Sequence, residues 1–408
     1  MPIAKQDFEA GLNQQTRPSG RGERLNLCVF IDGFGWSFFK RHGLLTDVLT
    51  FRRPVETLLG YSSTCDPTIL TGTMPNEHLH FSFYRYDPEA RAFPVWMRWL
   101  SALPAKLTGR GRVRNLLSRW VKRWLGWTGY FELYAVPFER LRYLDYSEKR
   151  DIYEPGGILG GQKTLFDRLR QHGTPFFLSD WRASERSNIE ALATSLQHET
   201  PALAYLFLGS LDGDLHRDGT DSAAGVARLR WYETEVRRLY ELASGLYDEV
   251  RLNVFSDHGM CDVVETSDLK LRVESLGLEY GVDYAAVYDS TMARFWFLKE
   301  SARPAILKEL QGENRGRVLS EEDLRGYGLD FPQSRYGEVI FLIKPGVLLC
   351  PSDMGLKPIQ GMHGYDPKHP DCVAMFASNE VPAQIPGRLD DLHDVLLEGL
   401  WTREAVAT

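Results

Sequence analysis

The chain alternates between continuous apolar runs and amphipathic segments. Three apolar runs are typical of strands buried on both faces, and each ends at an aspartate: LNLCVFIDGFG from Leu25, PALAYLFLGSLDGD from Pro201 and EVRLNVFSDHG from Glu249. Helical periodicity occurs after Ser63, from Gln162, from Ser184 and from Ser222 to about Tyr247. Strands that alternate with helices predict an α/β fold, with a mostly parallel central sheet and helices on both faces.

The three strand-end aspartates indicate where a ligand binds. In an open α/β sheet, ligands bind in the crevice beyond the carboxyl ends of the strands. Asp32, Asp212 and Asp257 are therefore expected to face one crevice. Asp214 is a rival to Asp212, although it lies one step further past the predicted strand end.

The rest of the chain divides around this core. Residues 1–24 are predicted to be a polar tail, residues 25–400 the main domain, and residues 401–408 a second tail. Residues 80–160 interrupt the alternation with aromatic and basic segments, which we interpret as a helical and aromatic cap inserted over the crevice. Residues 280–355 hold short strand-like runs and are predicted to form a smaller β-rich subdomain.

Composition predicts a folded and soluble protein, because 43% of the 408 residues are apolar. The first 24 residues are polar, broken by Gly and Pro, and lack an apolar run long enough for a signal peptide or a spanning helix. We therefore expect a cytoplasmic location. The five cysteines are odd in number, widely spaced and without a C-x-x-C pair, so neither a disulfide framework nor a thiolate zinc site is indicated, and buried reduced thiols are expected. They are Cys28, Cys65, Cys261, Cys350 and Cys372.

The net charge of −7 argues against nucleic acid as a partner, but one segment is strongly basic. Residues 105–125 contain seven cations and no acid. From residue 113 the segment also has helical periodicity, with an apolar face made of Val113, Leu116, Leu117, Trp120, Val121, Trp124 and Leu125. Three interpretations remain open: a surface helix docked on the core, peripheral membrane contact through the basic helix around 112–125, and a cap that guides an anionic substrate.

Aspartate and histidine recur together at the predicted crevice. Carboxylate and imidazole ligands suit zinc or manganese. Each motif alone is compatible with ordinary turn chemistry, but three aspartates and three histidines together are enough to hold two divalent cations, as phosphoryl transfer requires. The motifs are IDGFG with Asp32, LDGDLH with Asp212 and His216, SDHGM with Asp257 and His258, and GMHGYD with His363.

A nucleophile is available in the segment GYSSTCDPTILTGTMPNEH, which starts at Gly60. Residues 64–71 are predicted to form a short helix with its proline in the first turn and a glycine past its end. A hydroxyl just before this helix meets its free N–H groups and positive dipole end. Ser62, Ser63 and Thr64 all qualify, and one of them is also expected to cap the helix. Spacing alone does not choose among them.

With these motifs in place, the chain resembles the alkaline phosphatase superfamily, most closely its type I phosphodiesterase/nucleotide pyrophosphatase branch. In that superfamily the catalytic Ser, Thr or formylglycine commonly lies nine residues before the Thr of a Thr-Gly pair, which a Pro and a His follow. Here Thr71 and Gly72 are followed by Pro75 and His78, so the resemblance selects Ser62. It covers five motifs in the family's order, from about residue 25 to residue 380.

The resemblance implies an alkaline phosphatase-like catalytic domain with a two-metal site. One ion would be held by Asp32, Asp257, His258 and the Ser62 oxygen, and the other by Asp212, His216 and His363. Zn²⁺ is the family's usual metal, and Mn²⁺ is an alternative. The implied mechanism is in-line attack by Ser62 on the phosphorus of a small-molecule phosphoester, giving a phosphoseryl-type intermediate that metal-bound hydroxide hydrolyses.

Some positions depart from the family's pattern. Family members often have His-Gly after the Pro, where this chain has His78-Leu79-His80. Thr64 and Asp66 stand where a sulfatase needs Pro and Arg, which argues against sulfatase activity. Phosphodiesterase or nucleotide pyrophosphatase activity is the first hypothesis, with a phosphomonoesterase or phosphotransferase on the same metals as the alternative. A non-catalytic metal-binding interaction module is a hypothesis of another class.

Overall fold

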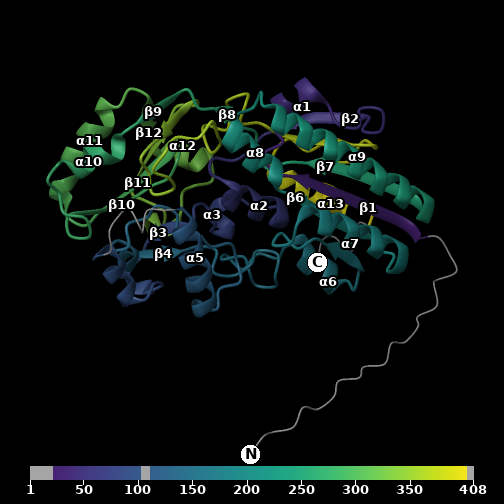
Figure 1. The fold of residues 1–408 in the computed structure, drawn as a ribbon, viewed down its shortest axis with the longest axis horizontal. Helices are drawn as coiled ribbons and strands as arrows, with labels where there is room; N and C mark the ends of the chain where they lie inside the picture. Colours follow the sequence, from purple (N-terminus) through teal and green to yellow (C-terminus); the bar gives the residue numbers. More distant parts are fainter. Residues whose placement is uncertain (1–21, 103–110, 402–408) are drawn as a thin grey trace, which may run out of the picture.

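A six-stranded mixed sheet forms the centre of the fold (Figure 1). The computed structural model describes residues 22–102 and 111–401. The strands lie in the order β2 (Phe51–Val55), β16 (Ala374–Ser378), β7 (Tyr247–Phe255), β1 (Gly22–Ile31), β6 (Leu203–Leu208) and β5 (Phe176–Leu178). β5, β6, β1 and β7 are parallel, as the apolar runs predict, whereas β16 is antiparallel to both of its neighbours.

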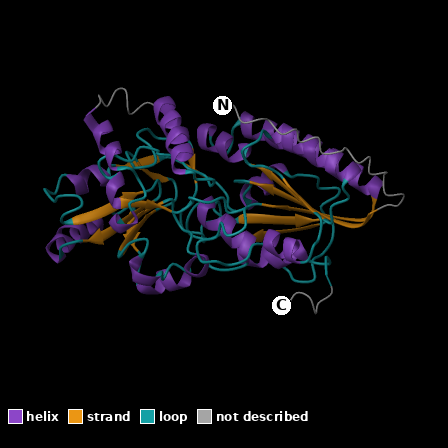
Figure 2. Ribbon diagram, turned by 90° about the horizontal axis from the view of Figure 1, so that it is seen from below, coloured by secondary structure: helices purple, strands orange, loops and turns teal. Residues whose placement is uncertain are grey.

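Helices cover both faces of this sheet (Figure 2), which confirms the predicted α/β class. Alternate side chains of β1 point to opposite faces. Leu27 and Val29 pack in the same core cluster as α1 (Trp36–His42), α7 (Glu185–His198), α8 (Ser210–Asp218) and α9 (Ala223–Leu246). Cys28 and Phe30 pack with α2 (Ser62–Thr71), α6 (Leu165–Gln171) and α13 (Leu392–Leu397).

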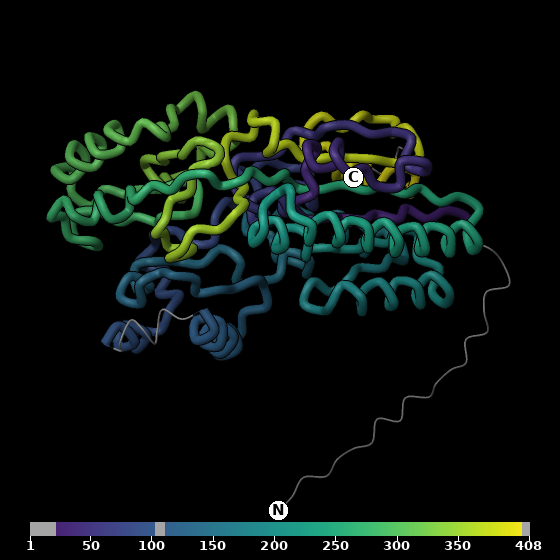
Figure 3. The backbone as a smooth tube through the Cα atoms, turned by 45° about the horizontal axis from the view of Figure 1, so that its top comes forward, coloured from purple at the N-terminus to yellow at the C-terminus, as the bar shows by residue number. Residues whose placement is uncertain are grey.

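An early strand and a late strand of the chain pair at one edge of the sheet. β2 and β16 pair there, and Figure 3 shows the purple and yellow segments side by side. β1 already begins at Gly22, so the first strand overlaps the segment that the sequence indicates as a tail. Trp401 donates a hydrogen bond to Thr174 at 2.9 Å, so this residue packs on the domain.

A second sheet of four antiparallel strands lies beside the central one. Its order is β10 (Tyr284–Tyr288), β11 (Met292–Phe297), β13 (Val339–Ile343) and β12 (Gly316–Val318). It packs with α10 (Leu269–Glu274), α11 (Arg303–Gly312) and α12 (Glu321–Gly326) (Figure 1). Two short ladders join this region to the central sheet: β9 (Glu265–Ser267) with β14 (Val347–Leu349), and β8 (Cys261–Asp262) with β15 (Gly361–Met362).

The segment after α2 contains α3 (Pro75–His78), the pair β3 (Tyr84–Tyr86) and β4 (Leu144–Tyr146), the 3₁₀ helix η2 (Val95–Ala102) and the helix α5 (Gly111–Leu125). The predicted apolar face of α5 is only partly docked. Val121 is buried, whereas Leu116, Trp120 and Trp124 are more than half exposed. Lys106 and Arg110 of the basic segment lie outside the described residues. Among the helices that the structure describes, none has the length and apolar character needed to cross a membrane.

Candidate metal and active site

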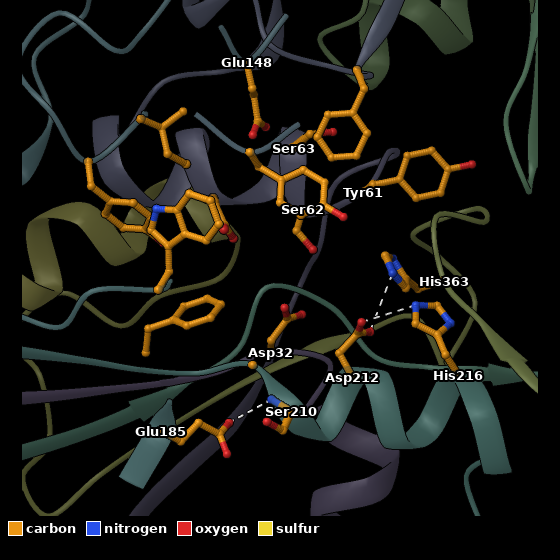
Figure 4. Close-up of a pocket in the computed structure, with 18 of the residues that line it drawn as sticks. Asp32, Tyr61, Ser62, Ser63, Glu148, Glu185, Ser210, Asp212, His216 and His363 are labelled. Atoms are coloured by element: carbon orange, nitrogen blue, oxygen red, sulfur yellow. Dashed lines mark hydrogen bonds and ion pairs between the residues drawn. The ribbon is translucent and has the colours of Figure 1, made fainter. Parts of the chain in front are cut away.

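Four chain segments bring acidic and imidazole groups together at the carboxyl edge of the parallel strands (Figure 4). Asp32 directly follows β1, and Asp257 and His258 follow β7 after one serine. Gly33 has a φ of +72°, and a Cβ there would lie 3.2 Å from Asp212 atoms, so only glycine lets the β1 turn approach so closely. The Gly33 N–H donates to Asp257 at 3.2 Å, which ties the first and third segments together.

Asp212 reaches the site from a helix and not from a strand end. β6 ends at Leu208, and Asp212 lies in the first turn of α8. His216 follows one turn later on the same side of this helix, and its Nε2 is 3.3 Å from Asp212 Oδ2. The predicted convergence of these two residues is therefore observed, with the aspartate placed by the helix. Asp214 points elsewhere and pairs with Arg228 and Arg217 at 2.8 Å each.

His363 follows β15 and completes the cluster. Its ring stacks on that of His258, with centroids 3.6 Å apart and planes 12° from parallel. Its Nε2 is 3.7 Å from Asp212 Oδ1, so Asp212 lies between His363 and His216. Two sets of three residues share Asp212: Asp212 with His216 and His363, and Asp32 with Asp212 and His258. Within each set, the three ligand atoms all lie within 4.8 Å of one another.

Asp257 and Ser62 approach the second of these sets. His258 Nε2 is 2.9 Å from Asp257 Oδ2, 3.7 Å from Asp32 Oδ1 and 3.2 Å from Ser62 Oγ. The structure thus brings all seven candidate residues of the sequence to one place.

The backbone fixes how two of the histidines face the cluster. His258 Nδ1 lies 2.9 Å from the carbonyl of Gly259, and His216 Nδ1 lies 2.7 Å from the carbonyl of Gly361. A carbonyl only accepts, so each Nδ1 carries the proton and each Nε2 faces the carboxylates. A histidine that binds a metal usually donates its other nitrogen in this way, which fixes the ring orientation.

The electrostatics show a cluster with excess negative charge. Burial, and then the neighbouring Asp257 and Asp212, raise the pKa of Asp32 well above its ordinary value. Burial opposes the charging of His258, but Asp257, Asp212 and the Gly259 carbonyl together raise the pKa of His258 to about 9. Burial and the neighbouring His258 lower the pKa of His363.

The residues fit two divalent cations. Among the described residues, Asp32 Oδ1, Asp212 Oδ1, Asp257 Oδ2 and His363 Nδ1 are buried polar atoms without a hydrogen-bond partner. Buried carboxylates without partners are costly unless they bind a cation or a proton. The oxygen and nitrogen ligands are those of zinc and manganese sites.

Ser62 is the first residue of α2 and points into the cluster (Figure 4). The helix begins two residues before the predicted start and ends at Thr71, with Gly72 in the left-handed conformation past its end. Its proline therefore lies inside the helix and not in the first turn. The N-terminal residues of a helix have N–H groups with no partner inside the helix, and these N–H groups attract a phosphate.

The neighbouring hydroxyls do not act as the expected helix caps. Tyr61 precedes the helix and provides no side-chain cap. Ser63 and Thr64 both donate to the carbonyl of Phe81, at 3.2 and 2.5 Å. Their hydroxyls are thus engaged away from the cluster, which leaves Ser62 as the hydroxyl that faces the ligands.

The histidines that depart from the family's pattern are structural. His78 Nε2 lies 2.9 Å from the hydroxyl of Thr68, and His80 Nε2 accepts from the N–H of Leu159 at 3.0 Å. Both are fully buried. His78 ties α2 to α3, and His80 ties the segment after α3 to the backbone at Leu159.

A cavity of about 1070 Å³ opens in front of Ser62. Sequence patterns did not single out its other walls. The aromatic wall includes Phe83, Tyr130, Tyr134, Tyr153 and Trp181. The acidic wall includes Asp66, Glu148 and Asp151. Burial, followed by repulsion from Asp151, raises the pKa of Glu148 to about 8. The scattered positions of these residues give no periodic signal, so only the fold reveals them.

A mixed α/β sheet with this crevice defines an enzyme fold of the alkaline phosphatase superfamily. Residues 26–366 match the type I phosphodiesterase/nucleotide pyrophosphatase family, and the chain belongs to that family. The family supports phosphodiester or pyrophosphate hydrolysis as the class of activity. No protein with curated function matches the sequence.

Solved structures of two relatives have the same fold. Human ectonucleotide pyrophosphatase/phosphodiesterase 5 is 14% identical and superimposes with a TM-score of 0.64, over 91% of this chain and 93% of the relative. The murine protein of the same name, in an inactive threonine-to-alanine variant in complex with AMP, is 15% identical with a TM-score of 0.63, over 92% and 94% of the two chains.

Proposed function

We propose that the protein is a two-metal phosphodiesterase or nucleotide pyrophosphatase that uses Ser62 as its nucleophile. One observation carries this proposal: the Ser62 Oγ stands at the N-terminus of α2, 3.2 Å from His258 Nε2 and beside the buried oxygens of Asp32 and Asp257 that accept no hydrogen bond. A hydroxyl in such surroundings is positioned for attack, because the helix end attracts the phosphoryl group that it must meet.

The chain's own residues divide between two cation positions. Asp32, Asp257, His258 and Ser62 would hold one ion, and Asp212, His216 and His363 the other. When bound, two such ions lower the pKa of the nucleophile and draw charge from the phosphoryl oxygens. Zn²⁺ is the first expectation and Mn²⁺ the second.

The reaction then takes place at Ser62. A bond forms from Oγ to phosphorus as the bond from phosphorus to the leaving oxygen breaks. Water hydrolyses the resulting phosphoserine ester and regenerates the hydroxyl. The first N–H groups of α2 face the phosphoryl oxygens in both steps.

The cavity favours a diester over a monoester. A monoester dianion needs cations around it, but of the two arginines in the cavity wall Arg228 is paired with Asp214 and Glu185, and Arg186 lies over the ring of Trp231 at 5.7 Å. The acidic wall repels a second negative charge. The aromatic wall offers faces for a ring: Phe83 lies 5.3 Å from Tyr130 and 6.0 Å from Tyr134 between ring centroids. The AMP complex of the murine relative is consistent with a nucleotide-containing substrate.

Turnover of an aryl phosphodiester and an aryl phosphomonoester by the zinc- or manganese-loaded protein tests this proposal. We expect the diester to be the better substrate, and Ser62→Ala to lower kcat by about 10⁴-fold or more, as the loss of a nucleophile does. Ser63→Ala is the matched control, since its hydroxyl bonds to the Phe81 carbonyl and its loss should change kcat less than tenfold. Full activity in Ser62→Ala would contradict the nucleophile assignment.

The alternatives give different results. A preference for the monoester, or transfer of the phosphoryl group to an added alcohol, would indicate a phosphomonoesterase or phosphotransferase. Two bound ions per chain with no turnover of a broad phosphoester panel would indicate a metal-binding module.

A further inference from the structure

A second group of metal-ligating side chains lies behind the active-site histidines. The cysteine spacing predicts buried reduced thiols and no thiolate zinc site, but the fold brings Cys261 of β8 next to Cys372 and His369 of the connection that leads to β16. Cys261 Sγ is 3.6 Å from Cys372 Sγ and 3.7 Å from His369 Nδ1. We name these three residues the Cys₂His cluster.

The distances from Cys261 Sγ to the other two atoms fit a metal ion between them, and all three atoms lie within 4.8 Å of one another. Tetrahedral zinc has Zn–S bonds of about 2.3 Å and Zn–N bonds of about 2.0–2.1 Å, which place two sulfurs about 3.8 Å apart and a sulfur and a nitrogen about 3.6 Å apart. The observed distances of 3.6 and 3.7 Å agree with these values to about 0.2 Å. A disulfide needs about 2.05 Å, so the two sulfurs are not bonded.

The cluster also has room for a fourth ligand. A cavity of about 280 Å³ touches Cys261 and His369 and is lined by Asp262 and Asp371. Asp262 is engaged, because it accepts from the N–H and hydroxyl of Thr220 at 2.7 and 3.0 Å. The Asp371 carboxylate or a water from the cavity can therefore take the fourth position.

We propose that the Cys₂His cluster binds a third metal ion, a soft divalent cation such as Zn²⁺, which clamps the two loops that carry His258 and His363. Cys261 lies three residues after His258, and Cys372 lies on the same connection as His363. These loops already touch, since the Gly259 N–H donates to the Cys372 carbonyl at 2.8 Å. An ion bound to both loops would cross-link them and fix the stacked histidine pair.

Cobalt substitution distinguishes this site from the catalytic one. The candidate catalytic residues offer only oxygen and nitrogen ligands, so an ultraviolet thiolate-to-cobalt charge-transfer absorption reports the Cys₂His cluster alone. We expect the reduced chain to show this absorption after it binds Co²⁺. Cys261→Ser and Cys372→Ser should abolish it, whereas Cys350→Ser, at a partly exposed thiol outside the cluster, should retain it.

Zinc analysis gives a second measurement that does not depend on activity. The wild-type chain should hold one more zinc ion than His369→Ala, a variant at a partly exposed residue that leaves both buried thiols in place. The proposal is overturned if the reduced wild-type chain shows no thiolate–cobalt absorption. It is equally overturned if mass spectrometry finds a Cys261–Cys372 disulfide in the chain as purified, or if His369→Ala retains the full zinc content and absorption.

A separate observation concerns the outer surface of η2 and α5. Trp96, Trp99, Trp120 and Trp124 are exposed there by 37, 65, 52 and 57%. The Trp96 ring contacts those of Trp120 and Trp124, with centroids 5.4 and 6.5 Å away. We name these four residues the tryptophan face. Such a group of exposed aromatic side chains marks an interaction surface.

The charges around the tryptophan face indicate the partner. Arg112, Arg119 and Arg123 are exposed on α5, and none of them forms an ion pair with the described part of the chain. Tryptophan suits the headgroup level of a bilayer, because its ring is apolar and its N–H is polar. An amphipathic helix with arginines beside tryptophans binds in the plane of an anionic membrane surface. We infer that the tryptophan face docks on an anionic lipid surface.

Sedimentation with lipid vesicles tests this inference. The chain should bind vesicles that contain phosphatidylserine, bind neutral phosphatidylcholine vesicles more weakly, and lose affinity as salt increases. The double variant Trp120→Ser/Trp124→Ser should bind at least tenfold more weakly, whereas Val381→Ser, at an exposed apolar residue elsewhere, should bind as the wild type does. No binding to anionic vesicles at low salt, or full binding by the double variant, would overturn the inference. Binding to a soluble nucleic acid or protein in place of vesicles would do so too.

Discussion

Replacement of Glu148 by Gln should remove a pH-dependent cost from the folded state. Glu148 is buried in the wall of the active-site cavity, and its pKa of about 8 is far above the ordinary value of 4.5. Between these two values the folded chain holds a proton that the unfolded chain has lost. The stability of the wild type must therefore fall as the pH rises through this window.

The magnitude follows from the two pKa values. Each tenfold difference in proton affinity corresponds to about 1.36 kcal/mol, so a pKa of about 8 against 4.5 gives at most about 5 kcal/mol above pH 8. For a chain of 408 residues, an unfolding entropy of about 2.1 cal/mol/K per residue converts this to about 6 °C in Tm. Glu148→Gln is neutral at every pH and should avoid this loss.

Thermal melts of the two proteins between pH 5 and pH 9 give the measurement, with a chelator present so that both clusters are free of metal. The Tm of Glu148→Gln minus that of the wild type should increase with pH by about 6 °C. Glu322→Gln, which changes an exposed carboxylate, should follow the wild type at every pH. Parallel profiles for the wild type and Glu148→Gln would refute the assignment of a raised pKa to this buried carboxyl.

Three further changes test the site and its support. Asp257→Asn keeps the shape of a fully buried side chain but removes its charge, and should lower kcat/KM on an aryl phosphodiester by at least about 10³-fold. The control Asp214→Asn should keep kcat/KM within a fewfold of the wild-type value. Arg294→Met leaves the buried Asp289 carboxylate, now 2.8 Å from the arginine, without its partner, and should cost about 3–5 kcal/mol in chemical unfolding; a change below 1 kcal/mol would contradict this. Chelation should lower Tm, since an ion at 100 times its Kd contributes about 2.7 kcal/mol, and an unchanged Tm would argue that the oxygens of the cluster hold no cation.

The sequence predicts the parallel core because each of its long strands is a continuous apolar run in the sequence. β1 is buried from Leu25 to Ile31 and β7 from Arg251 to Phe255, and their runs end at Asp32 and just before Asp257. The antiparallel strand β16 is only five residues long, and its position between β7 and the edge strand β2 depends on pairing with β2, more than 300 residues away in the chain. No local pattern contains that information.

For the active site too, the local sequence predicts some features and only the fold explains others. Elementary chemistry did not decide which of three hydroxyls is the nucleophile, and only the family resemblance selected Ser62. The structure supplies the physical reason, because the Phe81 carbonyl engages Ser63 and Thr64. Periodicity identified the apolar face of α5 but not its exposure, since periodicity cannot tell whether an apolar face meets the core or another surface.

The Cys₂His cluster shows why spacing rules miss sites built by long-range pairing. Cys261 and Cys372 are 111 residues apart, so no short motif contains them both. They meet because β8 pairs with β15 and because the connection after His363 returns to the loop after His258. The same return stacks His258 on His363 with centroids 3.6 Å apart. The loops that follow His258 and His363 are held together either by an ion in the Cys₂His cluster or by the packing of the Cys261 and Cys372 thiols. In both cases, this contact must affect the relative positions of the two candidate cations.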